Sequence, residues 1–215
     1  YAGITGPLRI VFGGIFGFVY APLVITGLHH MSNAIDLQLI ADFGGTMLWP
    51  MIALSNIAQG SAVLGMIYLQ KNDAQAQEVN IPSCISCYLG VTEPAMFGVN
   101  LKHSYPFICG MIGSACASIV CVATNSTANA IGVGGLPGIL SMQPQSMLTF
   151  AVCMLIAVAV PFVLTVMVGK KKLQPKEVKS VEEVKSAEVT ELKAFATGDA
   201  IALKEVNDGV FSAGT

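Results

Sequence analysis

Three long stretches without a charged residue dominate this sequence. No Asp, Glu, Lys or Arg occurs in Ile10–Ile35, Phe43–Gln70 or His103–Gly169, which are 26, 28 and 67 residues long. A helix needs ~20 predominantly apolar residues to cross the hydrocarbon core of a bilayer. Each stretch is long enough to reach across the membrane, so the sequence predicts an all-α polytopic membrane protein in the lipid bilayer.

The charged residues are concentrated at one end of the chain. Charged residues make up 11% of the sequence, whereas a soluble domain usually contains about 25%. Of the 24 charged residues, 16 lie in the last 46 positions, which predicts a membrane domain followed by a soluble tail. The net charge of −2 and the absence of a basic patch from the apolar part argue against a nucleic-acid partner.

The first and third stretches predict simple membrane helices. Ile10–Ile35 has room for one helix, followed by a polar segment at His29-His30. His103–Gly169 has room for two helices, at roughly 105–124 and 146–169, which an uncharged loop at 125–145 would join.

Two other segments predict re-entrant hairpins rather than spans. Val79–Leu101 is apolar but contains Glu93, two prolines and two glycines. Non-helical backbone at membrane depth is tolerated only inside the protein or beside a wet cavity. Phe43–Gln70 is interrupted by Trp49-Pro50 and by polar residues, so we do not expect a clean span there and consider a second hairpin.

The chain ends suggest a piece of a longer protein. Tyr1 lies within an apolar stretch without a signal-peptide pattern, so we expect a fragment. The three lysines 170–172 indicate a cytoplasmic end of the membrane domain, 1–172. Residues 173–189 have the mixed charge of a solvated linker. Residues 190–215 alternate apolar and polar side chains around two turns, as at the start of a β-rich domain, but stop too soon to bury its core.

Six cysteines lie in apolar surroundings, and Cys84 and Cys87 form a CxxC pair. Zinc would need further thiolate or imidazole ligands, and no second pair has matching spacing. We therefore interpret the cysteines as small helix-packing residues and predict no metal site and no cofactor.

Glu93 is the strongest candidate for function. A carboxylate within a membrane segment costs a few kcal/mol, so its presence indicates a role. Its neighbours Gly90 and Pro94 prevent a regular backbone. The alternative is a carboxylate that reaches the interface or caps a half-helix.

His29 and His30 follow Gly27 at the end of the first stretch. Adjacent helical residues point about 100° apart, so at most one imidazole is expected to face a site. An imidazole and a carboxylate together supply the donor and acceptor that a sugar hydroxyl requires. Hydrogen-bonded packing is the alternative role for either histidine.

Other polar residues leave two interpretations open. The amides of Asn56 and Gln59 suit a neutral sugar but equally suit bonds between helices. Asp36 could cap a helix or contact substrate, and Trp49 is slightly more typical of an interface anchor than of a sugar-stacking residue. The glycine-rich segment 131–138 lacks the context of a nucleotide-binding motif and predicts a flexible or close-packed loop.

Two motifs together resemble a known family. Gly27-Leu28-His29-His30, followed by GVTEPAMFGVN at 90–100, resembles the IIC membrane component of the phosphoenolpyruvate-dependent sugar phosphotransferase system, glucose superfamily. The segment 29–60 and the later LPGILSMQPQ resemble the trehalose branch, with the sucrose branch next. Tyr20-Ala21 stands where glucose and maltose members have Asn-Arg, which speaks against those substrates. The tail resembles the opening of a glucose-type IIA domain.

The resemblance implies a fold and a mechanism. Residues 1–172 would be the C-terminal part of a IIC domain in a bacterial cytoplasmic membrane, and the resemblance implies that this domain forms a homodimer. Glu93, Thr92 and one of the two histidines, with His30 favoured, would hold the 6-hydroxyl of a disaccharide; Asn56 and Gln59 are further candidates. Phosphorylated IIB would deliver phosphate to that hydroxyl, after transfer from the phosphocarrier HPr through IIA. The phosphorylated Cys of IIB and His of IIA would lie outside this chain, so no catalytic residue is expected in it.

Other classes of function explain the sequence less well. An ion-coupled sugar carrier also needs a membrane carboxylate, but it does not explain a IIA-like tail. An intramembrane hydrolase needs a nucleophile with an orienting base, and no such arrangement is visible. A channel would need more polar residues. A sucrose-specific permease is the nearest alternative to a trehalose permease.

Overall fold

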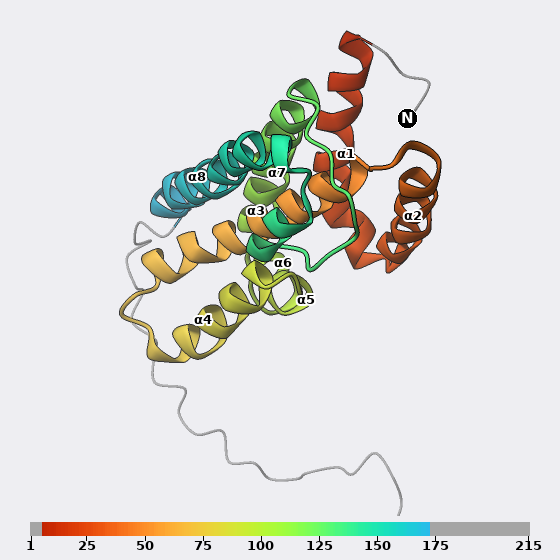
Figure 1. Cartoon of the computed structure of the whole chain (residues 1–215). Helices are drawn as coiled ribbons and strands as arrows, with labels where there is room; N and C mark the ends of the chain where they lie inside the picture. Colours follow the sequence, from red (N-terminus) through yellow and green to blue (C-terminus); the bar gives the residue numbers. More distant parts are fainter. Residues whose placement is uncertain (1–5, 173–215) are drawn as a thin grey trace, which may run out of the picture. The chain divides into compact units, whose positions relative to one another are not determined.

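The computed structural model describes residues 6–172. Within this range every regular element is a helix (Figure 1), which confirms the all-α prediction for these residues. Four segments are long and apolar enough to cross a bilayer: α1 (Pro7–Ile25), α3 (Leu48–Leu69), α7 (Tyr105–Ala123) and Pro144–Lys172, which contains α8 (Met147–Lys172). The predicted linker, 173–189, and the predicted IIA start, 190–215, lie outside the described residues.

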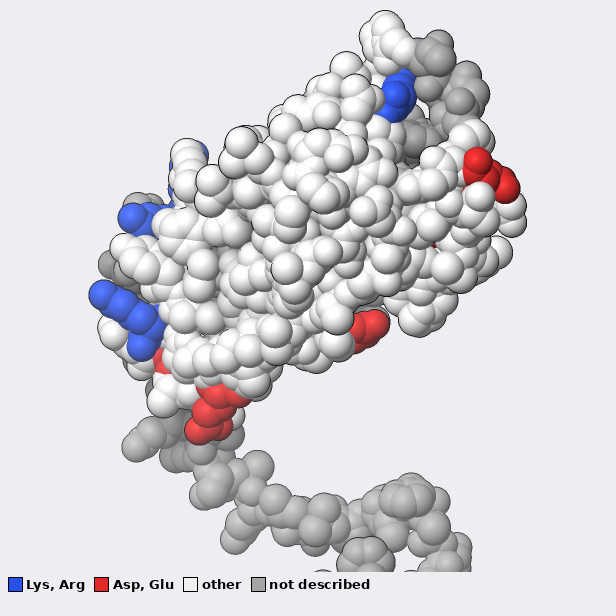
Figure 2. All heavy atoms as spheres, viewed as in Figure 1, with Lys and Arg blue, Asp and Glu red and all other residues white. Residues whose placement is uncertain are grey.

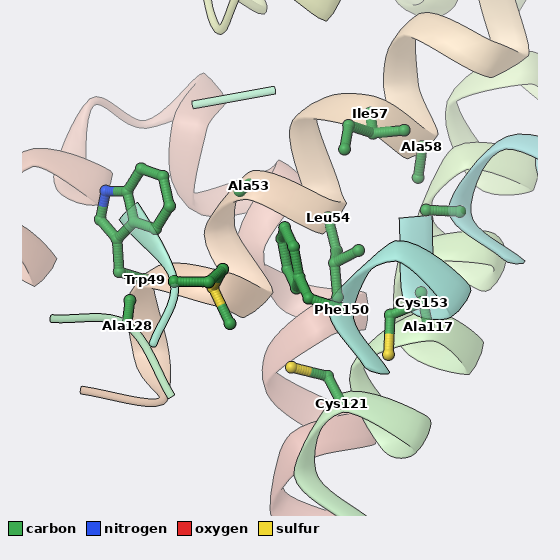
Figure 3. Close-up of a cluster of buried hydrophobic side chains, with 12 residues drawn as sticks. Trp49, Ala53, Leu54, Ile57, Ala58, Ala117, Cys121, Ala128, Phe150 and Cys153 are labelled. Atoms are coloured by element: carbon green, nitrogen blue, oxygen red, sulfur yellow. The ribbon is translucent and has the colours of Figure 1, made fainter. Parts of the chain in front are cut away.

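Helix α3 is the centre of this helical bundle. It packs against α1, α7, α8 and α4 (Ala74–Tyr88). In its most apolar window 78% of the residues are buried, compared with 28% in α1 and 22% in the last span. Figure 3 shows the largest apolar cluster, in which α3 meets α7 and α8; its members include Trp49, Leu54, Ile57, Ala117, Cys121, Phe150 and Cys153.

The expectation that Phe43–Gln70 is broken was wrong, because α3 is one continuous helix of 22 residues. Pro50 is the third residue of this helix. The first N–H groups of a helix have no partner within it, so a proline in the first turn removes no helical hydrogen bond. The Trp49-Pro50 sequence therefore starts this helix rather than interrupting it.

Several polar residues of α3 have hydrogen-bond partners inside the protein. The side-chain amide of Asn100 donates to the backbone oxygen of Gln59 at 3.1 Å and to its Oε1 at 2.7 Å. Gln59 Nε2 donates to the backbone oxygen of Phe107 at 3.4 Å, and Ser61 Oγ donates to that of Ile57 at 2.7 Å. Bonds of this kind let polar side chains occupy a membrane helix bundle.

Residues 74–103 form a helical hairpin, which can be followed in Figure 1 from α4 to α6. Helix α4 begins at a cap in which Asp73 accepts from the N–H of Ala76 at 3.0 Å, and it continues through Pro82. The chain turns at Gly90, whose φ of 104° suits glycine. The return arm consists of α5 (Glu93–Ala95), the π-helix η2 (Met96–Asn100) and α6 (Leu101–His103). The predicted hairpin shape is present; its depth in a membrane stays a prediction.

The predicted spans at 105–124 and 146–169 correspond to α7 and α8. The loop between them folds back onto the start of α3, where Ala128 forms bridges with Thr46 and Met142. The remaining elements are short: η1 (Leu28–His30), α2 (Met31–Phe43), η3 (Leu136–Ser141) and η4 (Pro144–Ser146).

The outer faces of α1 and α8 are apolar and exposed. Figure 2 shows a broad area without charge, with charged residues mostly near its edges. The exposed apolar side chains of α8 recur at helical spacing, and this face, together with that of α1, suits contact with lipid. They include Leu8, Val11, Ile15 and Phe18 of α1, and Leu148, Val152, Leu155, Val163 and Met167 of α8.

Candidate functional site

One cavity gathers most of the polar residues that the sequence singles out. Its volume is about 270 Å³, slightly below the ~300–1,000 Å³ of typical small-molecule pockets. Five parts of the fold contribute: the end of α1 with η1, the first turn of α2, the first half of α3, the hairpin turn, and the loop after α7. The lining residues are Tyr20, Val24, His29, His30, Asn33, Trp49, Ile52, Asn56, Gly90, Val91, Thr92, Glu93, Ile131, Gly132 and Gly134.

A glycine sets the direction of the two histidines. Gly27 adopts the left-handed conformation with φ 76°, which ends α1 and starts the single turn η1. Both imidazoles line the cavity, whereas helical spacing predicted that at most one would. In this short turn the two rings lie close together, with centroids 3.9 Å apart. The ring of His29 also meets that of Tyr20 edge-on at 6.4 Å.

The hairpin turn presents Glu93 to the cavity. Glu93 is the first residue of α5, directly after Thr92, which is 4% exposed. The side chain of Glu93 is 46% exposed and that of His29 15% exposed. Their nearest atoms, Glu93 Oε1 and His29 Nε2, lie 3.9 Å apart. The glutamate is thus open to the cavity and has an imidazole beside it.

The pKa of His29 is lowered from its ordinary value. Burial is the largest cause, the neighbouring His30 adds to it, and Glu93 opposes both. The lowered pKa favours a neutral imidazole at neutral pH, which has one donor and one acceptor nitrogen. Neutral His29 leaves the carboxylate of Glu93 without a formal ion pair to this residue, and so able to accept from a hydroxyl group.

The two amides of α3 lie in different surroundings. Asn56 lines the cavity, and its Nδ2 donates to the backbone oxygen of Gly90 at 3.4 Å. Gln59 is fully buried and bonded to Asn100, and it is not among the lining residues. The structure therefore brings Glu93, His29, His30, Thr92 and Asn56 together, but not Gln59. The role of each in binding stays a prediction.

Trp49 and Asp36 support the cavity from the start of α3. Trp49 is 3% exposed and lines the cavity, so the slightly favoured interpretation as an interface anchor was wrong. Asp36 of α2 is fully buried and accepts hydrogen bonds from the Thr46 hydroxyl and, at 3.1 Å, from the N–H of Trp49. Burial raises its pKa. Asp36 thus caps α3 from another helix.

Sequence reasoning missed three polar or loop parts of the lining: Tyr20, Asn33, and the loop residues Ile131, Gly132 and Gly134. The loop was predicted to be flexible or close-packed, and it packs closely, since a Cβ on Gly138 would lie 2.9 Å from the indole of Trp49. No charge or motif in the sequence marked this segment as part of the site.

The lining matches a neutral, hydroxyl-rich ligand. One carboxylate, two imidazoles, two amides and a phenol can donate to and accept from hydroxyl groups, while Trp49 and the aliphatic residues offer apolar surface. Among residues 6–172, no three His, Cys, Asp or Glu side chains gather as metal ligands would. The cysteine pair of α4 is buried against α3, with Cys87 Sγ 3.1 Å from the backbone oxygen of Asn56.

Comparison with known proteins decides the family. Residues 2–114 match the family model "Phosphotransferase system, EIIC", and this range includes both histidines and Glu93. The chain belongs to this EIIC family. The predicted resemblance is thereby confirmed, as is a multi-pass location in the cytoplasmic membrane, where EIIC is an integral component. No solved structure matches the chain.

The relatives of this EIIC chain carry two substrate names. It is 52% identical over 169 residues to the trehalose-specific EIIBC component of Escherichia coli K12, covering 79% of this chain and 36% of the relative. It is 50% identical over 167 residues to the sucrose-specific EIIBC component of Pasteurella multocida, covering 76% and 35%. A Pediococcus pentosaceus sucrose-specific EIIBCA component is 36% identical over 163 residues, covering 74% and 25%. The chain spans about a third of the length of the first two relatives.

Proposed function

We propose that this EIIC chain is part of a permease that carries a disaccharide, preferably trehalose, across the cytoplasmic membrane and phosphorylates it at the 6-hydroxyl. The single observation that carries the proposal is the meeting of Glu93 and both histidines at one cavity. Relatives named for trehalose and sucrose make a disaccharide the ligand to expect.

Each lining group has a part in this proposal. The carboxylate of Glu93 accepts a hydrogen bond from the 6-hydroxyl, and His29 or His30 supplies a donor or acceptor to the same sugar. Thr92 and Asn56 are further contacts, and Trp49 packs on apolar sugar surface. Gln59 acts indirectly, because it holds Asn100 of the return arm to α3.

The groups that carry the phosphoryl group to the sugar lie outside this chain. The hydroxyl oxygen forms a bond to phosphorus as the bond between phosphorus and the IIB carrier breaks. The sequence predicted no catalytic residue in this chain, but in this proposal Glu93 takes the hydroxyl proton as a general base. IIB is recharged by IIA, and IIA by HPr. The product is a phosphorylated sugar whose charge prevents its return through hydrocarbon. Residues 173–189 would be a linker and 190–215 the start of a IIA domain, in a permease that works as a homodimer.

The first experiment measures sugar uptake by the complete permease with Glu93→Ala. We expect uptake to fall at least a hundredfold at an unchanged amount of protein in the membrane. Glu78→Ala is the matched control, because Glu78 lies exposed on α4 outside the cavity lining. Normal uptake by Glu93→Ala would overturn the proposal.

Sucrose is the second candidate substrate, since the sucrose-specific relative is almost as similar as the trehalose-specific one. Titration of the complete permease with trehalose, sucrose and maltose separates the two. Tightest binding of trehalose supports the proposed substrate, and tightest binding of sucrose assigns the protein to the other branch. Uptake that continues without a phosphoryl donor would instead indicate an ion-coupled carrier.

A further inference from the structure

Three segments that are far apart in the sequence meet at one side of the cavity: α3 at Asn56, the hairpin turn at Gly90, and the loop at Gly134. The amide of Asn56 spans from α3 to the turn by its hydrogen bond to Gly90. Gly134 lies against the same amide, because a Cβ at this position would be 2.5 Å from Asn56 Nδ2. The Asn56 amide can therefore occupy this space only because Gly134 has no side chain.

The backbones of the turn and the loop are also in direct contact. A Cβ on Gly90 would lie 2.8 Å from the carbonyl carbon of Gly134 and 2.9 Å from its nitrogen. A Cβ on Gly135 would lie 2.8 Å from the carbonyl carbon of Tyr88. Both Gly90 and Gly135 have positive φ, of 104° and 83°. Only glycine combines this conformation with such close approach of two backbones.

This contact between the hairpin turn and the loop lies next to the residues that we propose to bind the sugar. Gly90 and Glu93 belong to the same turn, and Asn56, Gly90, Glu93 and Gly134 all line the cavity. A shift of the Asn56 amide would both remove its bond to the turn and change the wall that faces the ligand. The loop therefore affects the site at Gly134, although this residue has no side chain that could carry a charge or form a hydrogen bond.

We propose that Gly134 is a positioning residue for disaccharide binding: its missing side chain lets Asn56 join α3 to the hairpin turn that carries Glu93. This inference rests on the proposed function. It assigns a role to the glycine-rich loop, which packs into the site from a distant part of the chain and sets the position of a ligand-facing amide.

The test is Gly134→Ala in the complete permease. Gly134 is not among the glycines with positive φ, so alanine fits its backbone and the added methyl group acts on Asn56. We expect the Kd for the preferred disaccharide to rise about tenfold, which is the loss of roughly one polar contact. The control is Val133→Ala, because Val133 is 57% exposed and does not line the cavity. An unchanged Kd for Gly134→Ala would overturn the inference.

A double-mutant cycle with Asn56→Ala separates positioning from a general structural effect. If Gly134→Ala acts by displacing the Asn56 amide, the double variant binds sugar no more weakly than Asn56→Ala alone. Additive losses would show that the methyl group acts elsewhere, and would contradict the inference.

Two further measurements keep the result interpretable. If Gly134→Ala does not reach the membrane, Asn56→Ala in the same chain removes the overlapping amide and should restore the membrane level; no restoration overturns the inference. Glu93→Gln, measured in parallel, tests the proposed function itself. Loss of binding in Glu93→Gln with wild-type binding in Gly134→Ala would reject only the role of the glycine loop.

Discussion

At the scale of single residues, the interaction between His29 and Glu93 at the cavity depends on the protonation of His29. With a neutral imidazole, Glu93 can accept from a ligand hydroxyl. With a protonated imidazole, the two groups, whose nearest atoms are 3.9 Å apart, become an ion pair that competes for the same carboxylate oxygen. Binding of a neutral sugar is therefore expected to require neutral His29.

This requirement predicts a pH dependence. Burial holds the pKa of folded His29 below its ordinary 6.5, so the unfolded chain binds more protons than the folded one as the pH falls below that value. The contribution of His29 to stability is present above pH 6.5 and decreases as the pH falls through the lower, folded pKa. Sugar affinity should fall in the same direction, as titration calorimetry between pH 7.5 and 5.5 would measure.

Variants of the two histidines assign this effect. His29→Gln keeps a donor and an acceptor but cannot be protonated, so its affinity should change little over this range. His30→Gln should keep a pH dependence but move it to higher pH, because His30 contributes to the lowered pKa of His29. A dependence that survives in His29→Gln and disappears in His30→Gln would contradict the assignment.

Residues that carry charge or a motif could be located from the sequence, and residues that carry neither could not. Glu93 and the two histidines stand out because a carboxylate and imidazoles are costly in a membrane segment. Gly134 offers no chemistry of its own, and Tyr20 lies in an apolar helix like any packing aromatic. Their places at the cavity result from tertiary contacts between segments separated by up to 114 positions.

At the scale of elements, Asp36 connects α2 to the first turn of α3. Its carboxylate accepts from the N–H of Trp49 and from the Thr46 hydroxyl, which are a free backbone donor of the helix start and a loop side chain. This bond holds the beginning of α3, and with it Trp49, in place beside the cavity.

Removal of this cap should destabilise the protein. Asp36→Ala leaves the N–H of Trp49 buried without its acceptor, which costs about 1–3 kcal/mol. Asp36→Asn should cost less, because the amide oxygen can still accept and the burial of a charge is avoided. Thermal unfolding in detergent measures both, with the exposed Asp42 replaced by alanine as control. Equal stability of Asp36→Ala and the wild type would contradict this role.

The course of α3 shows why element boundaries were harder to predict than element types. Polar residues and Trp49-Pro50 suggested an interrupted segment. The helix is continuous because its proline lies in the first turn and because Asn100, distant in the sequence, satisfies Gln59. The spans of α7 and α8 contain no Asn or Gln side chain that needs such a partner, and their apolar length was sufficient to predict them.

At the scale of the described molecule, α3 forms a buried centre and the outer faces of α1 and α8 form an apolar surface. In water such a surface would strongly favour association of protein molecules, whereas in a bilayer it is solvated by lipid chains. The cavity is lined by five parts of the fold. A polar ligand could therefore be held by polar side chains of a protein whose outer helices face lipid, as a permease requires.

The most direct test of the account is equilibrium binding of trehalose to the complete permease, without phosphoryl donor, in wild type and in Glu93→Gln. The amide keeps the size of the side chain but removes its charge and half of its acceptor capacity. We predict a loss of affinity of at least tenfold in Glu93→Gln at unchanged unfolding temperature, and wild-type affinity in Glu78→Gln. Equal affinity in Glu93→Gln and the wild type would contradict the central claim that this carboxylate binds the sugar.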